Sequence, residues 1–325
     1  MTGTHPVFGG RKVLLISRFE GERHAHAPLR RRALERLGCG VAAVDLQPGG
    51  WLARLRGGDT ADRIARAVAD HRPELVLALG PVLPDAAVVA RLAGSGGAPW
   101  VLWWGGDDGV EPPSAAWDAF TQVWVADSDL AARVPGARYL PHGCDPSVHR
   151  PMRSRDEFRA NVVFVGEATP HRERLLGEVV EFGLAVWGPG WRRTRLRDYC
   201  RGDALAVEDY VRAYAGASVA LNFHREGPDG RVPSGAGCNA RTFELAAMGV
   251  AHVVDDRIDL ASQFVEGEEV AVFREPSELK PLVRELLQDQ ARAERLAAAA
   301  RRRALAEHTY VHRLRRLIDA AEDAA

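Results

Sequence analysis

Short apolar runs alternate with segments of helical periodicity along the first part of the chain. The apolar runs predict buried strands, because strands covered on both faces are apolar along their whole length. They lie at residues 12–17, 41–45, 75–79, 101–104 and 123–126. Helices are expected at residues 29–37, with Pro28 at the first helical position, and at residues 60–71. This alternation favours right-handed β-α-β units and a parallel sheet.

A stretch rich in proline, glycine and charge at residues 139–159 interrupts the pattern and suits an interdomain linker. A second alternation follows. Its strands are expected at residues 161–165, 184–187, 218–222, 251–254 and 270–273, and its helices at 171–182 and 239–249. The pattern therefore predicts two doubly wound, Rossmann-like α/β domains, at residues 1–145 and 146–325, with ligands outside the carboxyl ends of the strands.

The chain ends in a long helical tail. Its apolar stripe is typical of a docking surface, and packing of the final helix on the first domain is one option. The stripe consists of Tyr310, Leu314, Leu317 and Ile318.

Residues 239–249 carry the most informative pattern of the chain. Asn239 is a good helix cap, apolar positions at a spacing of three and four give one buried face, and Gly249 can end the helix. Arg241 and Glu244 lie off that face. A cation, free backbone amides and a carboxylate one turn along suit a nucleotide diphosphate, whose phosphates and ribose they would bind. The alternative is a capped surface helix with solvated Arg241 and Glu244.

Composition narrows the class of protein. The 325 residues are 46% hydrophobic and 27% charged, as in an ordinary soluble protein, and the net charge is −1. This charge gives no reason to expect nucleic acid or an anionic membrane as a partner. Four widely spaced cysteines argue against a disulfide scaffold or a zinc ribbon. With no signal peptide and no apolar run long enough to span a bilayer, we expect a cytoplasmic protein. The Ala- and Arg-rich composition suggests a GC-rich, bacterial genome.

Loops that follow strands of the second domain hold further candidates. Gly166 permits a close backbone approach, and Arg172 could neutralise a pyrophosphate from the next helix. That loop fits neither a dinucleotide fingerprint nor a P-loop, and an ordinary turn is the alternative. Trp187 and Gly188 are further candidates for donor binding. They begin a tight turn in which Trp191 either lines a nucleobase pocket or packs in the core.

Histidines are candidates in both domains. His224 enters a glycine-rich loop and either touches a ligand or is a plain loop residue. In the first domain, His26 or His24 follows the first strand and could act as general base on an acceptor hydroxyl, oriented by nearby glutamates. Asp107 follows another strand and could contact a sugar. Structural roles for these first-domain groups are equally compatible, and no ligands at metal-site spacing are apparent.

With these residues assembled, the second domain resembles the CgeB-like, spore-maturation-type glycosyltransferases of the GT-B superfamily. The matching segments are 140–146, 163–166, 187–191, 221–224, 239–244, 264–269 and 307–310. The resemblance implies a GT-B fold, in which two Rossmann-like domains face each other across a cleft. It also implies a nucleotide-diphosphate sugar as donor, held mainly by the second domain, and an acceptor held mainly by the first.

By the same analogy, Glu244 would bind the donor ribose, and Asn239, Arg241 and Arg172 would lie near the diphosphate, with Thr242 in the same motif. One departure stands out. Related retaining enzymes often carry an E-x7-E pair, and its first position here is Ala236. The usual contact to a sugar hydroxyl is therefore missing.

The expected activity is metal-independent glycosyl transfer without a further cofactor, because arginines and helix amides can stabilise a departing diphosphate. An inverting enzyme would need a base such as His26 or His24, whereas a retaining one could use the leaving phosphate. Two alternatives stay open: a sugar-nucleotide epimerase or hydrolase on the same fold, and a non-catalytic sugar-nucleotide-binding protein.

Overall fold

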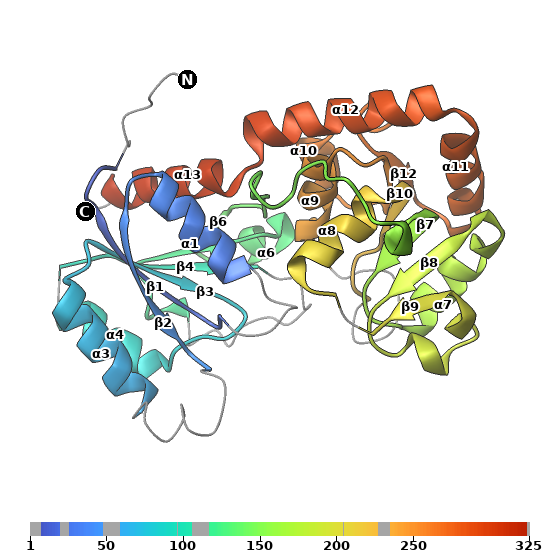
Figure 1. The fold of residues 1–325 in the computed structure, drawn as a ribbon. Helices are drawn as coiled ribbons and strands as arrows, with labels where there is room; N and C mark the ends of the chain where they lie inside the picture. Colours follow the sequence, from blue (N-terminus) through green and yellow to red (C-terminus); the bar gives the residue numbers. More distant parts are fainter. Residues whose placement is uncertain are drawn as a thin grey trace. The chain divides into compact units, whose positions relative to one another are not determined.

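The computed structural model describes residues 8–19, 26–47, 59–95, 97–105, 117–203, 205–226 and 235–323. The chain forms two compact units (Figure 1). Unit 1 combines Met1–Pro141 with Tyr310–Ala325, and unit 2 is His142–Thr309. Each unit is built on its own six-stranded parallel sheet.

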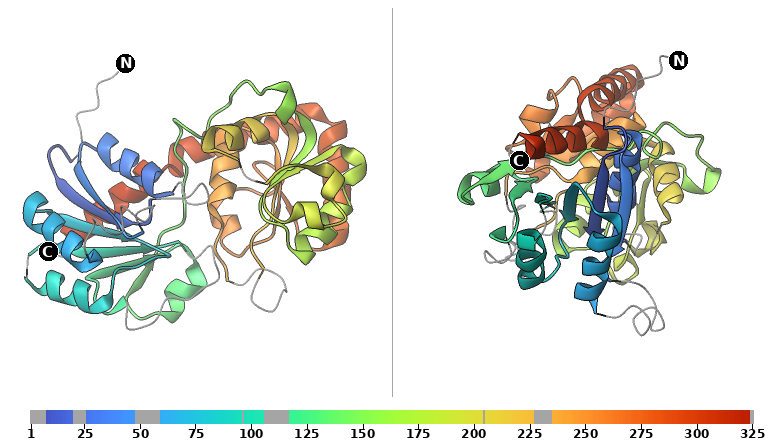
Figure 2. Two further views of the ribbon diagram at one scale, coloured as in Figure 1. Left: turned by 60° about the horizontal axis from the view of Figure 1, so that its bottom comes forward. Right: turned by 90° about the vertical axis from the view of Figure 1, so that its left-hand side faces the viewer.

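Unit 1 has the strand order β2-β1-β3-β4-β5-β6, with every neighbouring pair parallel. The strands are β1 (Lys12–Ser17), β2 (Gly40–Asp45), β3 (Leu75–Leu79), β4 (Trp100–Trp104), β5 (Gln122–Val125) and β6 (Ala137–Tyr139). All residues of β3, β4 and β5 are buried, as their continuous apolar sequence predicts. Figure 2 gives two further views of the ribbon.

Five helices of the described part of unit 1 accompany this sheet. They are α1 (His26–Arg36), α3 (Thr60–His71), α4 (Ala86–Ser95), α6 (Ser128–Arg133) and α13 (Tyr310–Glu322). Helix α1 begins at His26, so the prediction that Pro28 takes the first helical position is wrong. Proline is still tolerated there, because the N–H groups of a helix's first turn have no intrahelical partner.

Helix α13 follows unit 2 in sequence but packs in unit 1, against α1. The four residues of its predicted stripe are each 0% exposed, which confirms that the stripe docks. Polar contacts fix its two ends: Gln122 donates to the backbone oxygen of Ala320 at 2.8 Å, and Arg313 donates to that of Pro141 at 3.1 Å.

Unit 2 has the strand order β12-β11-β10-β7-β8-β9, again fully parallel. The strands are β7 (Ala160–Val165), β8 (Leu184–Trp187), β9 (Cys200–Gly202), β10 (Ala217–Asn222), β11 (His252–Asp255) and β12 (Ala271–Phe273). The α-helices described are α7 (Pro170–Gly177), α8 (Val207–Ala215), α9 (Ala240–Met248), α10 (Leu260–Gln263), α11 (Pro276–Gln288) and α12 (Gln290–Glu307). The two parallel sheets with flanking helices confirm the doubly wound α/β class.

Two details of unit 2 differ from the predicted elements. The helix expected at residues 171–182 ends at Gly177, and a single 3-10 turn, Val180–Phe182, follows it. The short edge strand β9 was not predicted. No helix in the described parts of either unit is long and apolar enough to cross a membrane.

Candidate functional site

The strand order of unit 2 marks the place where a ligand is expected. The chain runs from β7 outward to β9, returns to the other side of β7 at β10, and continues to β12. The crevice beyond the carboxyl ends of β7 and β10 is therefore the topological switch point, where open parallel sheets bind ligands. The loop after β10 contacts both the first turn of α7 and the start of α9 there.

Helix α9 begins and ends as its sequence predicts. Asn239 has an extended backbone (φ −67°, ψ 162°), and its Oδ1 accepts the N–H of Thr242 at 3.1 Å. Gly249 ends the helix in the left-handed conformation at φ 68°. The alternative of a surface helix is wrong, because α8, α12, β10 and β11 surround α9. Glu244 is only 8% exposed, and Arg241 is partly buried.

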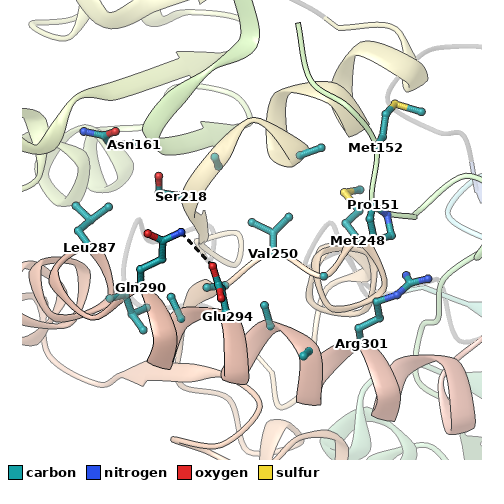
Figure 3. A pocket seen from close by; sticks show the side chains of 18 residues that line it. Pro151, Met152, Asn161, Ser218, Met248, Val250, Leu287, Gln290, Glu294 and Arg301 are labelled. Carbon is teal, nitrogen blue, oxygen red and sulfur yellow. Dashed lines mark hydrogen bonds between the residues drawn. The ribbon is translucent and has the colours of Figure 1, made fainter. Parts of the chain in front are cut away.

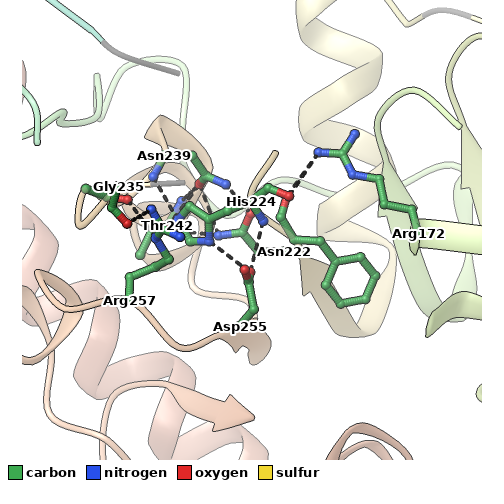
Figure 4. Close-up of polar contacts among 10 residues, drawn as sticks. Arg172, Asn222, His224, Gly235, Asn239, Thr242, Asp255 and Arg257 are labelled. Atoms are coloured by element: carbon green, nitrogen blue, oxygen red, sulfur yellow. Dashed lines mark hydrogen bonds and ion pairs between the residues drawn. The ribbon is translucent and has the colours of Figure 1, made fainter. Parts of the chain in front are cut away.

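A polar cluster joins the end of β10 to the start of α9 (Figure 4). Asn222 Nδ2 donates to Asn239 Oδ1 at 3.1 Å and to Thr242 Oγ1 at 2.9 Å. Asn239 Nδ2 donates in return to Asn222 Oδ1 at 2.9 Å. Asn222 and Thr242 are fully buried, so water does not compete for these bonds. The side chains of Asn239 and Thr242, both predicted to bind donor, thus hold the start of the helix in place.

His224 links the same helix start to β11 (Figure 4). Its Nδ1 lies 2.8 Å from Asp255 Oδ1, and this oxygen also accepts the backbone N–H of His224 at 2.9 Å. Its Nε2 accepts the backbone N–H of Asn239 at 3.0 Å. Burial raises the pKa of Asp255, but the interactions with His224 outweigh burial and lower that pKa below its ordinary value. Both ring nitrogens of His224 therefore have protein partners.

Two arginine side chains converge on one aromatic ring. The guanidinium carbons of Arg172 and Arg241 lie 5.5 Å and 5.9 Å from the centre of the Phe164 ring. Arg172 also donates to the backbone oxygens of Glu167 and Phe223, each at 3.2 Å. Burial and the Arg241 cation lower the pKa of Arg172 to about 10, so the side chain stays charged near neutral pH. Within the described part of the chain, the buried Nε atoms of both arginines have no hydrogen-bond partner.

The Glu244 carboxylate is held by side chains from two distant segments. Tyr210 of α8 donates its hydroxyl hydrogen to Oε2 at 2.6 Å, and His149 Nε2 lies 3.7 Å from Oε1. The Nδ1 of His149 accepts the backbone N–H of Asp145 at 3.1 Å, which leaves a proton on Nε2, toward Glu244. Burial and the charge of Glu244 raise the pKa of Tyr210, so the phenol remains a donor.

The turns after β7 and β8 approach each other closely. Gly188 has φ 136°, and a Cβ at this position would overlap the Gly166 carbonyl oxygen. That oxygen accepts the indole N–H of Trp191 at 2.7 Å. Trp191 is 0% exposed, so it packs in the core, and the alternative of a nucleobase contact is wrong. Trp187 is also a core residue, 2% exposed.

Of the residues predicted to act on the acceptor, the structure describes His26. It is the first residue of α1 in unit 1, and its Nδ1 lies 3.4 Å from the Tyr310 hydroxyl of α13. The other candidates lie outside the described residues: His24, Asp107, Glu20 and Glu22.

The position of the missing glutamate lies in a fixed segment. Ala236 is 0% exposed, and its backbone oxygen accepts the N–H of Asp259 at 3.1 Å. Arg257 donates to the backbone oxygens of Gly235 and, at 3.1 Å, Gly237 (Figure 4). The end of the glycine-rich loop is therefore fastened to the loop between β11 and α10, with the Ala236 side chain buried.

A hollow of ≈ 680 Å³ lies at the opposite, amino ends of the unit 2 strands (Figure 3). The starts of β7 and β10 and one face of α12 line it. Three of its polar side chains contact other protein groups. Gln290 donates to Glu294 at 3.0 Å, and Arg301 donates to the backbone oxygen of Ala247. Because ligands of parallel sheets bind at the carboxyl ends, this hollow is not the expected donor site.

The described residues include no group of three His, Cys, Asp or Glu side chains that could hold a metal ion. The cysteines are free thiols, as their spacing predicts. Burial raises the pKa of Cys238, so this thiol stays protonated.

Sequence reasoning missed several partners of the site. Tyr210 and Asp255 were not among the predicted site residues, and His149 lay in the predicted linker. The one available signal was position: Asp255 and Asn222 each lie at the carboxyl end of a strand, where polar residues are often functional.

Residues 171–319 match a family model described as "Glycosyl transferase-like". No curated protein matches the chain. Among solved structures, a sucrose-phosphate synthase from Thermosynechococcus elongatus is similar, with a TM-score of 0.69 and 14% identity over 97% of this chain and 100% of that one. The Anabaena protein HepE, solved with UDP and glucose, has a TM-score of 0.65 and 12% identity over 96% and 100% of the two chains.

An α-glucosyltransferase solved with UDP and a 13-mer DNA has a TM-score of 0.66 and 10% identity, over 96% of this chain and 99% of that one. At such identities these likenesses show the fold, which is GT-B. Together, the domain match and this fold support a glycosyltransferase.

Proposed function

We propose that this glycosyltransferase takes its sugar from a nucleotide-diphosphate donor, bound by unit 2, and transfers it to an acceptor without a metal ion. The observation that carries the proposal is the pair Arg172 and Arg241. Two like charges lie over one phenylalanine ring, and each has a buried Nε without a hydrogen-bond partner among the described residues.

A bound diphosphate would compensate both cations. The two cations repel each other, which contributes to the lowered pKa of Arg172, and the guanidinium fork matches phosphate oxygens well. As the sugar leaves, negative charge grows on the diphosphate, and arginines already in place stabilise that charge without reorganising. A CgeB-like subtype would fit this assignment.

The start of α9 adds backbone donors beside the arginines. Among the described residues, none accepts the N–H of Ala240 or Arg241, the first two helical residues. Free N–H groups and the helix dipole favour anions at this end. Glu244, one turn along, would accept hydrogen bonds from the ribose hydroxyls.

On the acceptor side, His26 is the proposed base for an inverting reaction. The Tyr310 hydroxyl, 3.4 Å from His26 Nδ1, is in position to orient the ring. In a retaining reaction the leaving phosphate would serve as base, and His26→Ala would then keep most of its activity.

Calorimetric titration with UDP-glucose and other UDP-, GDP- and dTDP-sugars tests donor binding. UDP-glucose is included because HepE has been solved in complex with it. We expect Arg172→Ala and Arg241→Ala each to weaken binding of the preferred donor by roughly tenfold or more. Arg174→Ala is the matched control, since Arg174 lies on the same helix but is exposed, and it should stay within about twofold.

Absence of binding across the panel, or equal affinity for all three variants, would overturn the proposed donor site. A turnover assay distinguishes glycosyl transfer from the epimerase or hydrolase alternative. Release of the nucleoside diphosphate that depends on an acceptor supports transfer, whereas release without any acceptor indicates an epimerase or hydrolase.

A further inference from the structure

The hydrogen bonds of the His224 imidazole allow only one tautomer of the neutral ring. The backbone nitrogen of Asn239 lies 3.0 Å from Nε2. Because an N–H can only donate, Nε2 must be unprotonated in order to accept this bond. The proton of the neutral ring is then on Nδ1, which donates to Asp255 Oδ1 at 2.8 Å. A carboxylate next to a histidine commonly fixes the ring in this way.

The backbone of His224 reaches the second cationic element. Its carbonyl oxygen and that of Phe223 lie 3.5 Å and 3.2 Å from Arg172 Nη2. His224 therefore contacts both groups assigned to the diphosphate: the Arg172 guanidinium through its carbonyl and the start of α9 through its ring.

We propose that His224 is a positioning residue of the donor site, which Asp255 holds in the Nδ1–H form so that its bare Nε2 fixes the start of α9 beside Arg172. This inference rests on the proposed donor site. His224 does not take part in proton transfer, since both ring nitrogens are engaged within the protein and its side chain is 5% exposed. Its contribution is geometric: donors held in the right place lose little freedom when the ligand binds.

Two substitutions separate the two ring nitrogens. In His224→Asn, the amide N–H₂ takes the place of Nδ1 and can still donate to Asp255, but nothing reaches Asn239. In His224→Gln, the longer side chain places an amide oxygen near the position of Nε2, where it can accept the Asn239 N–H. Asp256→Asn is the control, because Asp256 is the next residue in sequence, pairs with Arg274 at 3.3 Å, and lies outside the site.

The test compares UDP with uridine as calorimetric probes, or the matching pair for the base that the wild-type protein prefers. We expect His224→Asn to weaken diphosphate binding roughly tenfold while nucleoside binding changes less than about twofold. His224→Gln should recover most of the loss, and Asp256→Asn should bind like wild type. Equal loss of both probes in His224→Asn, or no recovery in His224→Gln, would show that His224 only supports the fold.

A second measurement needs no ligand. Nitrogen-15 NMR of histidine-labelled protein should show His224 with one protonated and one bare ring nitrogen, the protonated one being Nδ1. A ring protonated at Nε2 overturns the proposal. If the wild-type protein binds no nucleotide, the donor site itself fails, and the NMR result still decides how His224 is bonded.

Discussion

Glu244 is the residue on which the ribose assignment depends. Alanine at this position removes the acceptor for the ribose hydroxyls, and a hydrogen bond to a charged group contributes about 1.5–3 kcal/mol. We expect Glu244→Ala to weaken nucleotide-sugar binding by roughly tenfold or more, with an unchanged far-ultraviolet circular dichroism spectrum. Calorimetry measures this loss.

Tyr210→Phe is the control for Glu244→Ala. It keeps the buried ring and removes only the hydroxyl that donates to Glu244. Since the carboxylate remains, the loss of affinity should be smaller, about two- to fivefold. Full affinity in Glu244→Ala would place the ribose elsewhere.

The buried His252 makes the stability of unit 2 depend on pH. Burial lowers its pKa from 6.5 to about 4, and the side chain is 0% exposed. Between these values the unfolded chain binds a proton that the folded chain does not, so stability rises with pH across this window. Acidification from pH 6.5 to 4 should therefore remove up to about 3 kcal/mol.

Urea unfolding at several pH values between 4 and 7 checks this expectation. In His252→Leu the part of the slope due to this residue should disappear. An identical pH dependence in wild type and His252→Leu would contradict the assignment.

At the scale of single residues, the sequence identified candidate residues but not their surroundings. It marked Arg241 and Glu244 because a cation and a carboxylate near a helix start suit a nucleotide. It left open their solvation, because the partner Tyr210 lies 34 positions from Glu244. Such a contact is fixed by tertiary packing and leaves no local pattern.

At the scale of structural elements, the turn after β8 should tolerate substitution poorly. Gly188 combines φ 136° with backbone so close that a Cβ would overlap the Gly166 oxygen. We expect Gly188→Ala to destabilise unit 2 by more than about 2 kcal/mol, because neither the conformation nor the contact can relax cheaply. Denaturant unfolding gives the difference.

Gly177 provides the matched control for that substitution. It is the last residue of α7, and a Cβ there would meet nothing within 4 Å. Gly177→Ala should leave stability within about 1 kcal/mol of wild type, or raise it, since alanine is the better helix former. Equal effects of the two substitutions would mean that the turn is not as tight as described.

The elements that the sequence predicted share one property: a long, continuous apolar run or a clear helical face. The strands it missed are short and sit at sheet edges. β6 and β9 have three residues each and no fully buried residue, so they lack the apolar run that identifies β3 or β7. Helix α9 was predicted with one apolar face and is buried on several sides. Ala300 and Ala304 of α12 pack on the predicted apolar face, and α8 contacts the side that carries Glu244.

For the whole molecule, the repeated alternation of strands and helices was enough to predict two doubly wound units. The sequence did not decide which surface the final stripe covers. The structure places α13 in unit 1, so the chain crosses between the units twice, before His142 and after Thr309. Local periodicity identifies an amphipathic helix but not its partner, which depends on contacts far apart in the chain.

At the scale of the whole reaction, turnover should not depend on a metal ion. In the proposed mechanism Arg172, Arg241 and the start of α9 neutralise the leaving diphosphate, a role that Mg²⁺ has in other transferases. We therefore expect the EDTA-treated protein to keep its turnover within about twofold, since the two guanidiniums already supply the charge. The assay measures sugar transfer with and without EDTA, and again after excess Mg²⁺ or Mn²⁺. Activity that EDTA abolishes and Mg²⁺ restores would assign this charge compensation to a bound cation instead of the arginines.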